Sequence, residues 1–257
     1  MEDSVKAYRM SAQEFVAPVA DGAMLHGAGE QSVAAISAKP IGVSGGDVLR
    51  HIDRTLLRPK NYELVKRLHD VIFSLGFMLV CGVWLFPIIA LAIKLDSRGP
   101  VFFKQERVGW KGRKFSCLKF RTMSHNPGAC FIQAQKDDPR VTRAGKFLRK
   151  TNLDELPQFI NVLKGEMSVV GPRPHVYALD ELHCEEVAGY KLRTLVRPGV
   201  TGLAQVSGCR GETRSVRDMQ HRIRFDLFYL RNMSLMLDIK IIALTVLRLL
   251  QGDNNAY

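Results

Sequence analysis

One stretch of the chain, Val71 to Ile93, contains 23 residues and no charged side chain. A helix of about 20 apolar residues is long enough to cross the hydrocarbon core of a bilayer. The alternative is a helix buried inside a protein core. A domain of this size rarely needs a helix that is apolar on every side. The stretch therefore predicts insertion into a membrane.

Two features of this stretch bear on how it inserts. Pro87 lies about two-thirds of the way along it and removes one backbone hydrogen bond, so a kink is expected there. Basic residues flank both ends, whereas a spanning helix prefers its positive charge on one side. These flanking residues are Lys66, Arg67, Lys94 and Arg98. The pattern favours a re-entrant helix that returns to the face it entered, and leaves a straight span open.

The chain divides into three parts by composition. Residues 1–60 are rich in Ala, Gly and Ser and show no periodicity, which predicts a disordered extension. Residues 61–96 contain the membrane helix, and residues 97–257 form a separate region of mixed α and β character. We therefore expect an α+β fold attached to a membrane-embedded helix.

The pattern of residues 97–257 predicts its main elements. "PVFFKQERVG" and "RKFSCLKFRTM" are β-rich runs joined by the turn sequence "GWKGR", which indicates a β-hairpin. "LPQFINVLKGEM" predicts a helix that stops at Gly165. Residues 175–193 predict another helix, and "VRPGVTGLAQVSGCRG" a loop with a short strand. Two further helices follow, over 215–233 and 234–252; the second is apolar but carries charges, which is typical of an interfacial or core-packing helix.

The charge of the chain indicates an anionic partner. The formal net charge is +12, and residues 98–150 hold fourteen Lys and Arg against three Asp and Glu. Nucleic acid, an anionic membrane surface and a phosphorylated substrate would all suit this charge. No helix-turn-helix, zinc or RNA-binding signature is present, so nucleic acid is disfavoured. The basic stretch follows the apolar helix directly and should lie against the anionic cytoplasmic leaflet.

Asp154 and Glu155 stand side by side at the start of a predicted helix. Acidic residues in a first helical turn are favoured by the helix dipole, so a structural role is the simpler interpretation. On a helix, adjacent side chains point about 100° apart, so the two carboxylates could not both face one atom. They could divide the work, one attacking a substrate and the other holding Mg²⁺, which takes one or two carboxylates plus substrate phosphates.

Basic residues surround this pair in the sequence: Arg149, Arg173, Lys119 and Arg121. Arg173 lies between Pro172 and Pro174, which restrict the backbone on both sides. A guanidinium held in this way is suited to bidentate recognition of phosphate. The set as a whole indicates chemistry on a phosphorylated substrate.

Five motifs in order resemble the bacterial sugar transferases, the monotopic polyprenol-phosphate phosphoglycosyl transferases. They are "KRLHDV", "IKLDSRGPVFFKQERVG", "KFRTM", "LRKTNLDELPQFINVLKGEMSVVGPRP" and "RPGVTGLAQVSG". The resemblance covers Asn61 to about Gly252 and is strongest to short members that initiate exopolysaccharide synthesis. Many relatives carry Ser-Pro at the break in the membrane helix, where this chain has Phe86-Pro87.

The resemblance implies transfer of a hexose-1-phosphate from a UDP-sugar to undecaprenyl phosphate with release of UMP. It implies Asp154 as nucleophile, Glu155 as Mg²⁺ ligand, and Arg149 and Arg173 as contacts to phosphate or nucleotide. Lys119 and Arg121 would lie near the active site. Arg210 falls near a basic position of the family, although Cys209 disturbs the match. The enzyme would act on the cytoplasmic face of the bacterial inner membrane.

Two other functions remain open on the sequence. Asp154 could act as a general base for direct transfer, without a covalent intermediate. A membrane-anchored, anion-binding scaffold without enzymatic activity would also explain the charge. The sequence does not name the sugar, and it leaves a homodimer and the role of residues 1–60 open.

Overall fold

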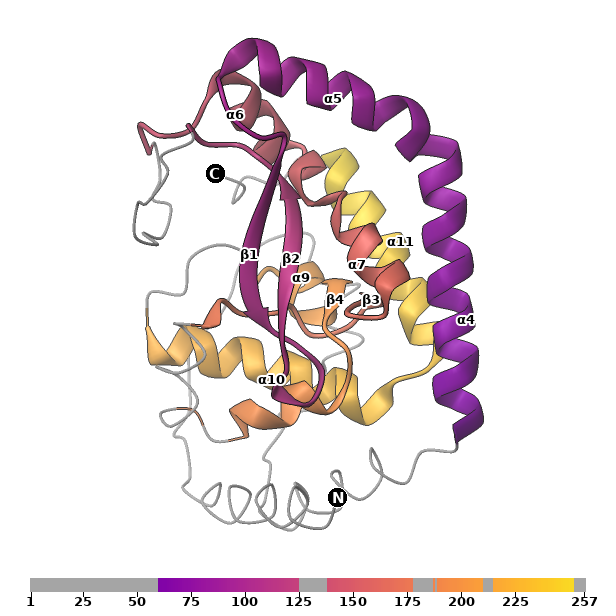
Figure 1. Cartoon of the computed structure of the whole chain (residues 1–257). Coiled ribbons are helices and arrows are strands. Elements are labelled where there is room, and N and C mark those ends of the chain that lie inside the picture. Colours follow the sequence, from indigo (N-terminus) through magenta and orange to yellow (C-terminus); the bar gives the residue numbers. More distant parts are fainter. Residues whose placement is uncertain (1–59, 125–137, 178–186, 188, 210–214, 252–257) are drawn as a thin grey trace.

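A computed structural model describes residues 60–124, 138–177, 187, 189–209 and 215–251 (Figure 1). The predicted disordered extension, apart from Lys60, lies outside these residues. So does the middle of the helix predicted for 175–193. Of the described residues of that segment, Tyr177 is α-helical, whereas Val176 forms a β-bridge with Arg107 and Tyr190–Leu195 is a 3₁₀ helix.

The first described elements form a long helical arm along the outside of the molecule (Figure 1). It consists of α4 (Lys60–Phe77), a π-helical turn (Met78–Gly82) and α5 (Val83–Asp96), which contains Pro87. α4 and α5 run in different directions in Figure 1. π turns and prolines are both common causes of helix bends. The π turn was not expected from the sequence, and the break at Pro87 stays a prediction.

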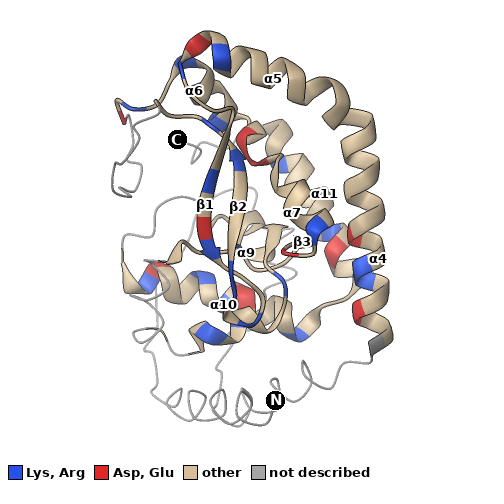
Figure 2. Ribbon diagram, viewed as in Figure 1, with Lys and Arg blue, Asp and Glu red and all other residues tan. Residues whose placement is uncertain are grey.

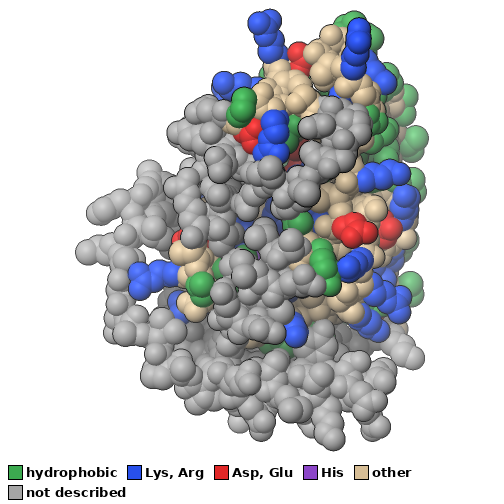
Figure 3. Space-filling view, turned by 60° about the vertical axis from the view of Figure 1, so that its left-hand side comes forward, with side chains coloured by type: hydrophobic (Ala, Val, Ile, Leu, Met, Phe, Trp, Pro, Cys, Tyr) green, Lys and Arg blue, Asp and Glu red, His purple; other side chains and the backbone are tan. Residues whose placement is uncertain are grey.

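Asn61–Asp96 is, within the described part of the chain, the one helical stretch long and apolar enough to cross a membrane, judged by length and composition. Its most apolar window has a mean hydropathy of 2.4, and 17% of that window is buried. A core helix would be mostly buried, so this low burial favours membrane insertion over the alternative of a buried core helix. Large apolar side chains instead gather along one edge of the molecule, over α4 and α5 (Figure 3).

On α4, polar side chains face the rest of the protein and apolar side chains face outward, which is the reverse of the usual amphipathic pattern. Lys66, Asp70 and Ser74, spaced four residues apart, are buried against the rest of the protein. Apolar side chains on the same helix are exposed, among them Leu64, Leu68, Ile72 and Leu75. An exposed apolar face of this kind marks a surface that meets a membrane or another apolar partner.

The inward polar residues of α4 bind β3 (Ser168–Val170) and α11 (Leu235–Gln251). Lys66 Nζ donates to Asp238 Oδ2 at 2.6 Å and to the carbonyl of Val170 at 3.2 Å. Asp70 accepts a hydrogen bond from the backbone N–H of Val169 at 3.0 Å. These contacts attach the helical arm to the centre of the fold.

The predicted hairpin is confirmed. β1 (Phe102–Val108) pairs antiparallel with β2 (Lys114–Phe120), and Phe102 lies opposite Phe120. The connecting turn, Trp110–Gly112, needs a positive φ of 56° at Lys111 and of 72° at Gly112. Figure 1 shows the hairpin crossing the middle of the molecule, and Figure 2 shows the basic residues that it carries.

The hairpin is followed by two short helices and a small parallel sheet. α6 spans Arg143–Lys150 and α7 spans Gln158–Lys164, ending as predicted at Gly165, where φ is 85°. β3 pairs in parallel with β4 (Gly199–Thr201), and α9 (Leu203–Val206) follows directly. The predicted short strand is therefore present, whereas the parallel pairing and α9 were not foreseen.

α10 (Val216–Asn232) and α11 complete the fold where the sequence predicted helices. A capping box between Ser215 and Asp218 starts α10. The main core lies between α4, α7, the small sheet, α10 and α11, and includes Val162, Val170 and Ile241. The described structure is thus a mixed α and β fold, as predicted in outline, held against one long apolar arm.

Candidate active site

Asp154 and Glu155 lie on a 3₁₀ turn, Leu153–Glu155, between α6 and α7. Asn152 turns the chain at the end of α6 with a φ of 56°. α7 begins only at Gln158, so the pair does not occupy the first turn of that helix. The pair instead lies in the first turn of the 3₁₀ helix, a position that is compatible with the helix-start interpretation as well as with chemistry.

Glu155 is held by two cations from separate parts of the fold. Lys119 on β2 places Nζ 2.7 Å from Glu155 Oε1. Arg173 makes a bidentate contact: Nη1 donates to Oε2 at 2.9 Å and Nη2 donates to Oε1. The pairing of Glu155 with Lys119 and Arg173 brings together three residues that the sequence had nominated separately.

Asp154 lies next to this cluster and is 8% exposed. Its Oδ2 is 3.9 Å from the Nζ of Lys119. The expectation that the two carboxylates could not face one atom is therefore wrong for the Lys119 ammonium. The Lys119 side chain reaches both carboxylates because the 3₁₀ turn that carries them packs against β2, the strand that carries Lys119.

The two neighbouring carboxyl groups differ in their electrostatics. Burial raises the pKa of Asp154, while the charge of Lys119 opposes that rise. Burial would also raise the pKa of Glu155, but Arg173 and Lys119 outweigh it and hold that pKa well below its usual range. Glu155 is thus a permanent carboxylate bound to cations, and Asp154 is the less shielded member of the pair.

Arg149 approaches Asp154 from α6. Its Nε donates to the hydroxyl of Thr122 at 2.9 Å. Asp154 is the main charge that favours protonation of Arg149 against the effect of its burial, which lowers the pKa of the guanidinium. α6 packs tightly here, since a Cβ at Gly145 would lie 2.0 Å from the carbonyl oxygen of Thr122. This close approach places Arg149 beside the acidic pair.

Arg121 and Arg210 are not seen in this group. The guanidinium of Arg121 donates to the carbonyls of Ser97, at 2.8 Å, and of Arg98. It therefore binds the carboxyl end of α5, and its described hydrogen bonds go there rather than to the acidic pair. Arg210 lies outside the described residues.

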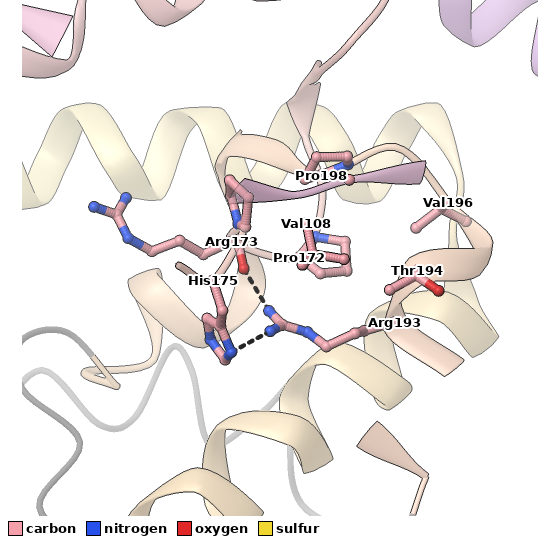
Figure 4. A pocket seen from close by; sticks show the side chains of 10 residues that line it. Val108, Pro172, Arg173, His175, Arg193, Thr194, Val196 and Pro198 are labelled. Atoms are coloured by element: carbon pink, nitrogen blue, oxygen red, sulfur yellow. Dashed lines mark hydrogen bonds between the residues drawn. The ribbon is translucent and has the colours of Figure 1, made fainter. Parts of the chain in front are cut away.

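Several buried residues beside the site were missed by the sequence analysis: Arg107, His175, Tyr190, Arg193 and Asp226. Of these, His175 and Arg193 line a hollow behind the Pro-Arg-Pro segment. Figure 4 shows His175 and Arg193 turned toward each other there, while the Arg173 guanidinium points away from the hollow. Arg107 lies inside one motif already quoted and His175 directly follows another, but spacing in the sequence carried no signal that these residues meet.

The donor groups at the site fit a magnesium ion that also binds substrate phosphates. A carboxylate offers about four lone-pair positions, and Glu155 uses three of them in hydrogen bonds to Lys119 and Arg173. One position and the neighbouring Asp154 remain. Within the described residues no group of three or more His, Cys, Asp or Glu side chains could hold a metal ion by itself. A metal here would depend on ligands from the substrate, which is usual for Mg²⁺.

Comparison with known proteins identifies the family. The model of the family described as "Bacterial sugar transferase" matches residues 61–252, which include the helical arm, the hairpin and the acidic pair. The chain belongs to the bacterial sugar transferase family. The resemblance seen in the five sequence motifs is therefore confirmed.

Relatives within this family carry related names. A UDP-glucose:undecaprenyl-phosphate glucose-1-phosphate transferase of Klebsiella pneumoniae is 51% identical over 186 residues, which are 71% of this chain and 39% of that protein. A transferase of the same name from Caulobacter vibrioides is 46% identical, covering 75% of this chain and 72% of its own. The exopolysaccharide production protein PSS of Rhizobium leguminosarum is 45% identical, covering 71% and 94%.

The relatives differ in length. The match spans about two-fifths of the Klebsiella protein but nearly all of the Rhizobium protein. The shared part contains Asp154, Glu155 and the Pro-Arg-Pro segment. Of these three relatives, the long Klebsiella protein is the most identical to the chain, so the expected stronger resemblance to short members is not supported.

Proposed function

We propose that this protein transfers a hexose-1-phosphate from a UDP-sugar to undecaprenyl phosphate, releasing UMP. The observation that carries the proposal is the buried Asp154 beside Glu155, with Glu155 fixed by Lys119 and Arg173. Family membership and the names of the relatives supply the substrate class. UDP-glucose is the donor that these names favour.

The reaction proceeds in two steps. A carboxylate oxygen of Asp154 attacks the phosphorus that bears the sugar, and the bond from that phosphorus to the oxygen of UMP breaks. An acyl phosphate then links Asp154 to the sugar phosphate. A phosphate oxygen of undecaprenyl phosphate attacks the same phosphorus, the bond to Asp154 breaks, and the carboxylate is regenerated. The product is a lipid-linked diphosphosugar.

The attacking Asp154 carboxylate and the donor phosphate are both negatively charged. The basic side chains around them lower the barrier that this repulsion creates. Lys119 contacts both carboxylates, and the positive charge of Arg149 also acts on Asp154. Arg173 presents a fixed guanidinium to the donor phosphate or nucleotide. Charges held in place before the reaction stabilise a transition state without reorganising during it.

Mg²⁺ is part of the proposal, with Glu155 as its protein ligand. When bound, the ion would neutralise charge on the diphosphate of the donor. The remaining lone-pair position on Glu155 and the need for substrate ligands support this assignment. Glu155 is held in its ionised form by its cationic neighbours, so it is ready to bind a metal at neutral pH.

The proposal places the enzyme on the cytoplasmic face of the inner membrane, with α4 and α5 entering and leaving that face. Exposed apolar side chains on the arm and buried polar ones on its inner face support contact with lipid. Arg121 joins the end of α5 directly to β2, so the far end of the arm meets the strand that carries Lys119. Such a connection is expected if both ends of the arm lie on the same side of the membrane as the catalytic residues.

A tag placed in turn before α4 and after α11 tests the topology. A re-entrant arm leaves both tags accessible from the cytoplasm alone. Accessibility of the two tags from opposite sides of the membrane would show that the arm spans it.

Release of UMP tests the activity itself. Purified protein is incubated with undecaprenyl phosphate, Mg²⁺ and a panel of UDP-sugars that includes UDP-glucose and UDP-N-acetylgalactosamine. We expect UMP release with UDP-glucose. Absence of UMP with every donor would refute the proposed function and leave the anion-binding scaffold as the better explanation.

The covalent step has its own test, because direct transfer with Asp154 as a base remains the alternative. Intact mass is measured after mixing the protein with donor alone. We expect a phosphosugar adduct in the wild type and none in Asp154→Asn. If no adduct forms and Asp154→Asn still turns over, Asp154 is not the nucleophile.

A further inference from the structure

The Pro-Arg-Pro segment is held through its carbonyl groups. Pro172 and Pro174 have no backbone N–H to donate, so the segment depends on its acceptors for anchoring. The carbonyl of Pro172 accepts from the N–H of Gly199 at 2.9 Å, and that of His175 accepts from Val108 at 3.2 Å. The two ends of the segment are thus attached to β4 and to the end of β1.

Two arginine side chains bind the carbonyls in between. Arg193 Nη2 donates to the carbonyl of Arg173, and Arg107 Nη1 donates to that of Pro174 at 2.6 Å. Arg193 is 5% exposed and Arg107 is 8% exposed. All four carbonyls from residue 172 to residue 175 therefore have a donor, and the backbone that carries the Arg173 side chain is fixed at each step.

Arg193 is itself held from two further sides. Its Nη2 is 2.9 Å from Asp226 Oδ2 on α10, and both side chains are buried. Its Nη1 contacts His175 Nδ1 (Figure 4). A guanidinium can only donate, so Nδ1 must be the unprotonated nitrogen of His175. Burial and the surrounding arginines lower the pKa of His175 well below its usual range, which keeps this acceptor available.

We propose that Arg193, fixed by Asp226, is a positioning residue that aims the Arg173 guanidinium at Glu155 and at the donor phosphate. The inference rests on the proposed function for the identity of the donor. Arg193 does not itself reach the acidic pair in the described contacts. Its effect passes through the backbone of Arg173, whose side chain leaves the hollow on the opposite side (Figure 4).

Arginine is specifically suited to this position. Its planar fork binds the Asp226 carboxylate, the Arg173 carbonyl and the His175 ring at once. Lysine would keep the charge opposite Asp226, but a single ammonium cannot reproduce the geometry of the three contacts. Arg193→Lys therefore keeps the charge balance with Asp226 while removing the contacts that position Arg173.

A double-mutant cycle tests the proposal. The measured quantity is kcat/KM for the UDP-sugar at saturating undecaprenyl phosphate, in wild type, Arg193→Lys, Arg173→Lys and the double variant. We expect Arg193→Lys to lower it about 10²-fold, because small misplacements of a positioning group have effects of this size. When Arg193→Lys is added to Arg173→Lys, we expect kcat/KM to fall by less than about a further threefold. The effects of two groups that act through one another are not additive. Arg224→Lys, on an exposed part of α10, is the matched control and should behave as wild type.

A merely structural role would give a different pattern. Losses that multiply in the double variant would mean that Arg193 does not act through Arg173, and would overturn the proposal. If Arg193→Lys does not fold, Asp226→Asn enters the cycle in its place and must show the same dependence on Arg173.

A second measurement does not need turnover and so separates this inference from the proposed function. Hydrogen exchange is followed in the peptide that covers residues 171–176, with a peptide from α7 as internal reference. We expect faster exchange at 171–176 in Arg193→Lys, with α7 unchanged. Unchanged exchange at 171–176 would overturn the positioning role even in an active enzyme, whereas a wild type that releases no UMP would refute the proposed function alone.

Discussion

Lys66 on α4 and Asp238 on α11 form a buried ion pair with 2.6 Å between Nζ and Oδ2, although they are 172 residues apart in the chain. Tyr229 adds a hydrogen bond to the other carboxylate oxygen at 2.8 Å. The pair connects the apolar arm to the last helix, at the edge of the small sheet. The burial of this Lys66–Asp238 pair is the basis of the first prediction.

We expect Asp238→Asn to destabilise the folded protein by about 3–5 kcal/mol, because it leaves the Lys66 ammonium buried without a counter-charge. Thermal unfolding of the purified protein in detergent measures the change. The double variant Lys66→Met/Asp238→Asn removes both charges and should recover most of the loss. A double variant less stable than Asp238→Asn would contradict this account of the pair.

Arg173→Lys should lower kcat/KM for the UDP-sugar, because lysine cannot make the bidentate contact that Arg173 makes with Glu155. We expect a loss on the order of 10–100-fold, comparable to that of other supporting groups around a metal ligand. Steady-state kinetics with varied donor measure it. Kinetics equal to wild type would show that Arg173 does not contact the donor.

Glu155→Gln should reduce activity and weaken its dependence on Mg²⁺, because a neutral amide binds the ion poorly. The same change leaves Lys119 and Arg173 without their shared carboxylate. A Mg²⁺ titration of UMP release compares the variant with the wild type, and chelation should abolish the activity of the wild type. An unchanged Mg²⁺ titration curve would remove Glu155 as the metal ligand.

The buried His175 predicts a pH dependence of stability. Its pKa is lowered well below the ordinary 6.5 by burial and by four nearby arginines: Arg193, Arg222, Arg107 and Arg173. The unfolded chain therefore takes up a proton near pH 6.5 while the folded protein does not. The contribution of His175 to stability is fully present above pH 6.5 and is lost as the pH falls below it.

The slope of this loss is about 1.4 kcal/mol per pH unit for a single group. Unfolding free energies are measured from pH 8 to pH 5 in the wild type and in His175→Gln, and the difference between the two curves isolates the group. We expect the variant curve to be flatter below pH 6.5 than the wild-type curve. Parallel curves would mean that His175 becomes protonated in the folded protein at its ordinary pKa.

Local sequence patterns were sufficient for several elements. The two runs rich in Val, Phe and other apolar residues on either side of the turn sequence "GWKGR" predicted the hairpin, and Gly165 predicted the end of α7. The charge-free run from Val71 predicted the long apolar helix of the arm. Each of these depends on residues close together in the chain, where turn geometry and helical periodicity act directly.

Other features depended on partners far away. The π turn at Met78–Gly82, the parallel pairing of β3 with β4 and the helix α9 have no local signature. Arg121 binds carbonyls at the end of α5 that the arm brings within its reach, and its place near the active site stays a prediction. The predictions for residues 1–60, for Arg210 and for the middle of 175–193 fall outside the described residues.

The sequence by itself determined the family, the apolar arm and the identity of the residues suited to phosphate chemistry, because these depend on residue type and short spacing. The tertiary structure decided which of those residues meet. It brought Lys119 and Arg173 onto Glu155, kept Asp154 beside them, and surrounded the Pro-Arg-Pro segment with donors from β1 and from Arg193. Contacts of this kind follow from how distant elements pack, and no single segment of the chain encodes them.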